Sequence, residues 1–147
     1  MLRLAGREAD VVGINASLRA GHLGAHAVVD LSHERVARKL EWVAEGAAAS
    51  GRTLHDLELE MNVWLARVTP DAAAAAEFVD RVATRMQVDP RLLWESPSVL
   101  VGTAAQIIDT LVDRREQLGL NYFQLDAGFP VPDLEAFAPV IEQLTGT

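Results

Sequence analysis

Apolar and polar residues alternate more regularly from residue 57 to residue 68 than anywhere else in the chain. Leucine, methionine and valine occupy every second position, while glutamate, asparagine, tryptophan and alanine stand between them. Successive side chains of a strand point to opposite faces of a sheet, so this pattern predicts one long β-strand with an apolar face. It is the strongest strand signal in the sequence.

Two shorter strands are expected at residues 10–15 and 121–126, each an apolar run beside turn-forming residues. Helical periodicity fills the rest, apart from a glycine- and histidine-rich loop at 16–31. The expected helices cover 1–8, 32 to about 49, 70 to about 86, a short stretch from Pro90, 103–118, and 133–144. Strands that alternate with helices are typical of βαβ units and a parallel sheet.

Several helix ends carry recognisable signals. Ser32 is expected to cap the second helix, and Pro70 to occupy the first position of the third. Thr103 and Gln106 have the spacing of a capping box, and Gly119 suits the end of the helix that follows. Asp133 is expected to cap the last helix. The first helix has no residues before it to cap its N–H groups, which suggests a segment cut from something longer.

The composition limits the classes of function. The chain has 147 residues, enough for one domain over 1–147, and a formal net charge of −8. An acidic chain is a poor partner for nucleic acid, because phosphate binding needs a basic surface. Absence of cysteine excludes disulfides and thiolate chemistry, and no apolar run approaches the length of a membrane span. A cytoplasmic location is therefore expected.

Two segments resemble luciferase-like flavin- or deazaflavin-dependent oxidoreductases. MLRLAGREADVVGIN is similar to the part that follows their glycine-rich turn, and SPSVLVGTAAQIIDTLVDRREQLGLNYFQLD to their last helix–strand unit. The resemblance implies an α/β fold, a partial (β/α)8 TIM barrel with about three parallel strands and five to six helices. It also implies that five strands and the glycine-rich turn, which helps to hold the cofactor phosphate, are missing before Met1.

The resemblance implies hydride transfer or monooxygenation on a small organic substrate with a reduced deazaflavin coenzyme or FMN. Three hypotheses follow for this chain. It is one piece of an oxidoreductase, completed by a complementary barrel chain; or a self-assembled derivative, expected to be a homodimer, that uses no cofactor; or a non-catalytic remnant. Three parallel strands cannot close a barrel, so a second copy, a separately encoded partner or rearranged helices must cover the open sheet.

Asn15 and Asp126 are the first candidate catalytic residues. Both end a predicted strand, and in barrel enzymes the carboxyl ends of the strands face the active site. The alternative is that they are turn and cap residues. His26 is a third candidate, as a general acid or base. His22 and His26 have a spacing compatible with metal binding, but the flanking glycines and the lack of a nearby carboxylate favour no metal site.

Arg67, Gly102 and Thr103 are the candidate cofactor-binding residues. Arg67 lies at the far end of the long strand and suits an anionic substrate or a phosphate. Gly102 and Thr103 open a helix where an anion could bind, although a plain capping box explains them equally. The sequence predicts that the ends of parallel strands bring Asn15, Arg67 and Asp126 to one rim of the sheet.

Overall fold

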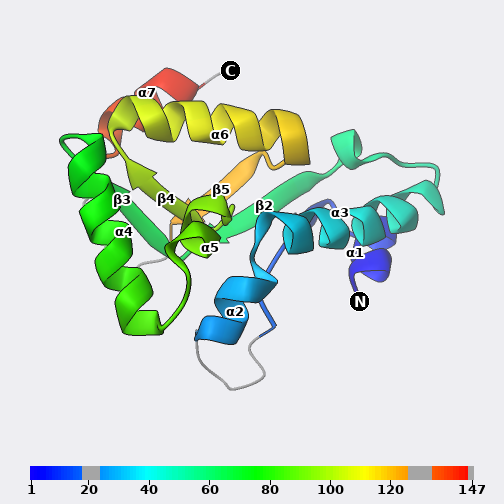
Figure 1. The fold of residues 1–147 in the computed structure, drawn as a ribbon. Coiled ribbons are helices and arrows are strands. Elements are labelled where there is room, and N and C mark those ends of the chain that lie inside the picture. The colour runs from blue at the N-terminus through cyan, green and yellow to red at the C-terminus, as the bar shows by residue number, and fades with distance from the viewer. Residues whose placement is uncertain (18–23, 126–133, 146–147) are drawn as a thin grey trace.

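The computed structural model describes residues 1–17, 24–125 and 134–145, and it has a mixed α/β fold (Figure 1). The strands are β1 (Val11–Gly13), β2 (Glu58–Val63), β3 (Leu65–Val68), β4 (Val99–Gly102) and β5 (Tyr122–Leu125). The helices are α1 (Leu2–Glu8), α2 (Ala25–Asp30), α3 (His33–Ala48), α4 (Ala72–Met86), α5 (Pro90–Glu95), α6 (Ala104–Leu118) and α7 (Ala138–Leu144), with a 3-10 turn at Leu54–Asp56.

All strand pairs are parallel, as the sequence predicts, but they form two sheets. The order β1-β2-β5 makes a three-stranded sheet, and β3 with β4 makes a second one. The described residues form seven α-helices, rather than the five to six expected. In Figure 1, α3 runs alongside β2, while α4 and α6 lie beside β3 and β4.

The prediction of one continuous strand over 57–68 is wrong, because the strand breaks at Trp64. The N–H of Trp64 donates to the Ser98 carbonyl at 3.2 Å, and the Ser98 hydroxyl donates to the Asn62 carbonyl. The chain thereby changes its neighbour from β5 to β4. Both faces of the second sheet are covered, so Leu65 and the adjacent Ala66 are both buried.

Three further expectations are corrected. β4 lies where a helix start alone was expected, and α2 lies inside the predicted loop 16–31. The third helix begins at Ala72, with the Asp71 carboxylate accepting from the Ala74 N–H at 2.8 Å, so Pro70 precedes the helix. The caps at Ser32 and Thr103 and the left-handed Gly119 are confirmed. Asp133 lies outside the described residues.

The central strand β2 separates a buried face from an accessible one. Leu59, Met61 and Val63 are 0 % exposed; the first two pack against α3, and Val63 packs toward α6. The opposite side of the β1-β2-β5 sheet is here called the open face, and the alternation of side chains assigns it eight residues. They are Val11, Gly13, Asn15, Glu58, Glu60, Asn62, Tyr122 and Gln124.

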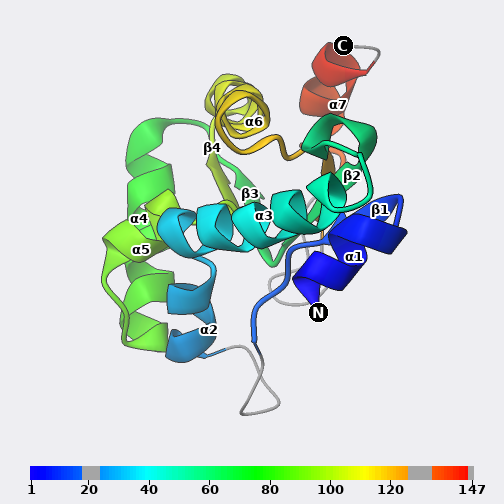
Figure 2. The ribbon, with the colours of Figure 1, turned by 90° about the vertical axis from the view of Figure 1, so that its right-hand side faces the viewer.

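Helix α1 packs closely on α3, beside each other in Figure 2. A Cβ atom on Gly46 would lie 1.9 Å from the carbonyl oxygen of Arg3, and one on Gly6 would lie 2.1 Å from that of Val43. Real Cβ atoms do not approach backbone oxygen so closely, so only glycine permits this contact at both positions. The pair of glycines therefore fixes α1 against the outside of the β1–β2 layer.

Replacing Gly46 by alanine is expected to lower the free energy of unfolding by about 3 kcal/mol, at the upper end of overpacking effects. The clash is with the backbone, so rotation of a side chain cannot relieve it. Urea denaturation measures the change. Gly51→Ala is the control: nothing lies within 4 Å of its added Cβ, and its left-handed backbone (φ 75°) costs about 1 kcal/mol. Equal losses in both variants would contradict the close packing.

Candidate functional site

The open face of the sheet holds the main group of polar side chains near strand ends. Asn15 and Glu60 lie over Gly13: an added Cβ there would be 3.0 Å from the Asn15 amide nitrogen and 3.3 Å from a Glu60 carboxylate oxygen. Asn15 is exposed and Glu60 half-buried. An amide and a carboxylate therefore converge above a backbone position without a side chain, and they occupy the space that a Cβ atom there would need.

Two buried polar atoms at the end of β2 have no hydrogen-bond partner among the described residues: the amide oxygen of Asn62 and the indole nitrogen of Trp64. One is an acceptor and the other a donor. A buried polar atom without a partner costs about 1–3 kcal/mol, so such atoms in a native fold need an explanation. The sequence analysis did not single out Asn62 for function.

A buried ion pair holds the end of β1. The Lys39 ammonium donates to the Asp30 carboxylate at 2.8 Å and to the carbonyls of Asn15 and Asp30, both at 2.9 Å. The Ser17 N–H donates to the same carboxylate at 2.8 Å. Lys39 thus ties α3 and α2 to the backbone of the candidate residue Asn15. The signal for this contact was a lysine one residue before Leu40 on an otherwise apolar helix face.

The guanidinium of Arg67 lies 4.9 Å from the ring centroid of Phe78 on α4, a cation–π arrangement. Arg67 is exposed and belongs to the second sheet, where it pairs with Val101. By extension of the β1–β2 register, Asn15 lies beside residue 62. Arg67 comes five residues after residue 62 along the chain, a distance of up to roughly 16 Å from Asn15. The expectation that Asn15 and Arg67 share one rim of one sheet is therefore wrong.

Gly102 and Thr103 lie together at the end of β4, next to the end of β3. The Thr103 N–H donates to the Gln106 side chain at 3.0 Å, and the Gln106 N–H donates to the Thr103 hydroxyl at 3.3 Å. This capping box already uses two of the N–H groups that an anion would need. The geometry supports the capping role that the sequence also allowed.

His26 is exposed on α2, one helical turn before Asp30. Its positive form helps to lower the pKa of Asp30, although its contribution is the smallest of several. Asp126 and His22 lie outside the described residues. Within residues 1–17, 24–125 and 134–145, no group of three or more potential metal ligands comes together. No helix in these ranges is long and apolar enough to cross a membrane.

No protein-family model matches the chain, and no curated protein matches it. Solved structures do match. They include the coenzyme F420 dependent tetrahydromethanopterin reductase from Methanopyrus kandleri, with 17 % identity and a TM-score of 0.53 over 97 % of this chain. Riboflavin lyase RcaE, with modified FMN and substrate riboflavin, matches 97 % of this chain at 13 % identity and TM-score 0.60. The monooxygenase RslO1 from Streptomyces bottropensis matches 96 % at 19 % and 0.56.

The chain spans less than half of these proteins: 46 % of the reductase, 40 % of the lyase and 41 % of the monooxygenase. At these identities the likeness concerns the fold. The chain therefore shares the TIM-barrel-like fold of part of these proteins, in agreement with the partial-barrel fold that the resemblance in its sequence implied. The open face corresponds to the inner side of the sheet, because α3 covers the other side.

The Asp30–Lys39 ion pair makes the stability of the fold depend on pH. Burial alone would raise the pKa of Asp30, but hydrogen bonds from Lys39 and the Ser17 N–H outweigh it and hold the pKa below its usual range. A carboxyl with a lowered pKa stabilises the fold above its unfolded value, near 3.9, and this contribution is lost as the pH falls through the folded pKa. We expect Asp30→Asn to melt at a lower temperature than the parent chain at neutral pH.

That difference in melting temperature should shrink as the pH is lowered from about 5 to about 2. Glu34→Gln is a suitable control, because Glu34 is an exposed residue in the first turn of α3, outside the ion pair. A difference that stays constant with pH would show that the Asp30 carboxylate contributes nothing through its charge.

Proposed function

We propose that this chain supplies one wall of the active site of a flavin- or deazaflavin-dependent oxidoreductase. The enzyme would act on a small organic substrate, either by hydride transfer or by monooxygenation. The observation that carries the proposal is the unpartnered donor and acceptor at Trp64 and Asn62, beside the open end of β1. They stand on a fold shared with an F420-dependent reductase, a riboflavin lyase with FMN and a monooxygenase.

The polar groups near the open face fit a flavin-type ring. Such a ring is flat and carries alternating N–H and carbonyl groups along one edge, which an indole N–H and an amide oxygen can match. When bound, the cofactor would supply the hydride chemistry, while this chain would bind and orient the ring.

The same face does not fit a phosphate. Its charged residues are Glu58 and Glu60, and it has no basic side chain. Carboxylates repel a phosphate, so a cofactor phosphate would have to be held elsewhere. Arg67 and the start of α6 are the proposed phosphate-binding positions within this chain. The capping box at Thr103 would have to open before the start of α6 could bind a phosphate. Asn15, Asp126 and His26 remain the proposed groups for the substrate.

In the proposed enzyme, further β/α units would cover the open face, because a closed barrel needs about eight strands. Val11 and Tyr122 are 46 % and 45 % exposed on that face, and no described strand pairs with the outer edges of β1 or β5. A complementary barrel segment suits this face better than a second copy of it. In a symmetric face-to-face homodimer, Glu58 and Glu60 would meet their own copies.

The alternative function is a cofactor-free binding protein or enzyme on the same fold. It is favoured by the unfavourable environment for phosphate on the open face, and it would use Asn15 and Glu60 to bind a neutral polar ligand. Titration with flavins distinguishes the two functions.

We expect the chain to bind riboflavin and FMN with dissociation constants that agree within about threefold, because the ring and not the phosphate makes the contacts. The constant for FMN should exceed about 1 µM, since donors to the phosphate are each worth about 1.5–3 kcal/mol and are missing from this face, and the constant for riboflavin should lie in the same range. Quenching of flavin fluorescence measures both. Absence of saturable binding for either flavin would favour the cofactor-free alternative.

Asn62→Leu separates function from stability. The change removes an acceptor that has no partner among residues 1–17, 24–125 and 134–145, so the melting temperature should stay constant or rise. Riboflavin binding should weaken about tenfold, the loss expected for one hydrogen bond to the ring. Glu58→Gln, at the opposite end of β2, serves as the control and should leave binding unchanged. A variant that loses stability without losing affinity would assign Asn62 a purely structural role.

A further inference from the structure

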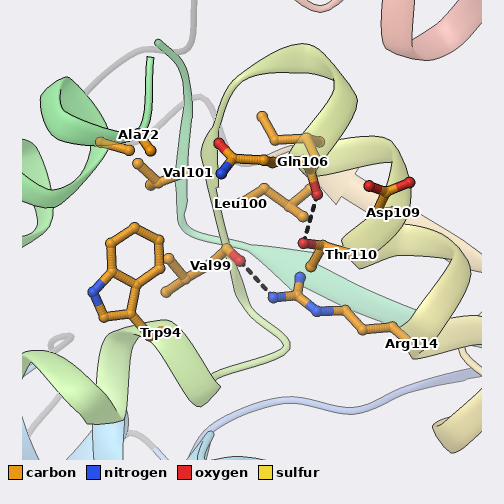
Figure 3. Close-up of a pocket in the computed structure, with 11 residues that line it drawn as sticks. Ala72, Trp94, Val99, Leu100, Val101, Gln106, Asp109, Thr110 and Arg114 are labelled. Atoms are coloured by element: carbon orange, nitrogen blue, oxygen red, sulfur yellow. Dashed lines mark hydrogen bonds between the residues drawn. The ribbon is translucent and has the colours of Figure 1, made fainter.

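A cavity of about 280 Å³ lies in the helix layer, away from the open face. It is partly open to solvent and is lined by α4, α5 and α6 together with the strand β4 of the second sheet (Figure 3). Much of its lining is apolar, from Ala72, Ala75, Val99, Leu100, Val101 and Ile107. An apolar cavity of about 150 Å³ holds benzene, so this one has room for a substituted aromatic ring.

Arg114 brings a positive charge to this cavity. It projects from α6 and is 8 % exposed, and burial lowers its pKa to about 10, so it stays charged at neutral pH. Its guanidinium donates to the carbonyls of Pro97 at 2.8 Å, Ser96 at 3.0 Å and Val99 at 2.7 Å. None of the ion pairs among the described residues includes Arg114.

The charge of Arg114 is therefore hydrogen-bonded but not neutralised. The three carbonyls accept three of the five N–H groups of a guanidinium, so two N–H groups take no part in these bonds. A buried charge without an opposite charge is costly, and carboxylate is the group whose geometry a guanidinium matches best. Asp109 also lines the cavity, but it is exposed, so water screens its repulsion of an anion.

Trp94 gives the cavity a second distinctive feature. Its indole is 44 % exposed at the side of the cavity nearest α5, facing Val99 and Ala72 in Figure 3. An aromatic side chain exposed to this extent offers a flat apolar surface for a ligand ring. Thr110 and Gln106 complete the polar side, with the Thr110 hydroxyl donating to the Gln106 carbonyl at 2.7 Å.

We propose that this cavity is a second ligand site, which binds a small aromatic carboxylate with its carboxylate at Arg114 and its ring against Trp94. The site is separate from the open face, because its walls are the helices on the second sheet. It does not depend on the cofactor or on the parts of a barrel that would cover the open face. Its occupant would hold α4, α5 and α6 together, and so stabilise the strands β3 and β4 that follow Trp64.

Titration with benzoate by isothermal calorimetry tests the site, with benzyl alcohol as a neutral ligand of similar size. We expect saturable one-to-one binding of benzoate, and at least about tenfold weaker binding of benzyl alcohol, because the alcohol lacks the charge-assisted hydrogen bond. Benzoate should also quench tryptophan fluorescence, and Trp94→Leu should abolish the quenching. Equal affinity for both ligands, or no saturable binding, would overturn the proposal.

Two neighbouring alanines provide a matched pair of variants that leave the Arg114 hydrogen bonds in place. Ala72→Phe fills the cavity and should weaken benzoate binding at least about tenfold, whereas Ala73→Phe, one residue along and outside the lining, should not. Arg114→Met should remove the preference for benzoate over benzyl alcohol. Arg114→Met also loses the hydrogen bonds to the carbonyls of Ser96, Pro97 and Val99 and so can fail to fold. In that case the comparison of Ala72→Phe with Ala73→Phe tests the site, and equal benzoate binding by the two variants would overturn the proposal.

Discussion

The pairing of β2 is the constraint on which the rest of the structure depends. Its side chains on the helix-covered side, Leu59, Met61 and Val63, are wholly buried, and the strand is hydrogen-bonded to β1 on one side and β5 on the other. Because β5 comes about sixty residues later in the chain, the long excursion through β3, α4, α5, β4 and α6 must return to the edge of the same strand. The side-chain amide of Asn121 marks that return, since it accepts from the Leu59 N–H at 2.8 Å.

The sequence was sufficient to locate the strands with a period of two and the helices with strong caps. It did not reveal the break at Trp64, since the alternation continues through the residue where the strand changes partner. Four successive apolar or small residues at β4 have no period that distinguishes a strand from a helix start. The short α2 was missed because glycine and histidine dilute its pattern, and its helical form depends on packing of Val28 against Trp64 and Leu93.

The candidate residues divide in the same way. The position of Asn15 just after a strand could be predicted, because it depends only on the order of residues along the chain. Arg67 was placed on the same rim only by assuming one straight strand, and the break removes that assumption. Lys39 and Arg114 were missed, yet each interrupts an apolar helix face: Arg114 stands between Leu111 and Leu118 at helical spacing. A charged residue at a core position predicts a buried polar contact, although its partners depend on tertiary structure.

The two polar regions of this fold make different demands on stability. At the end of β2, the buried atoms of Asn62 and Trp64 that have no partner among the described residues oppose folding of the chain by itself, and a ligand or a covering segment would satisfy them. Around Arg114, three carbonyls already accept from the guanidinium, so the arginine serves the fold with the cavity empty or filled. A ligand gains there only from charge and from contact with Trp94. In the two proposals, binding at the first region would therefore be coupled to assembly, whereas binding at the second would be coupled to the rigidity of the helices over β3 and β4.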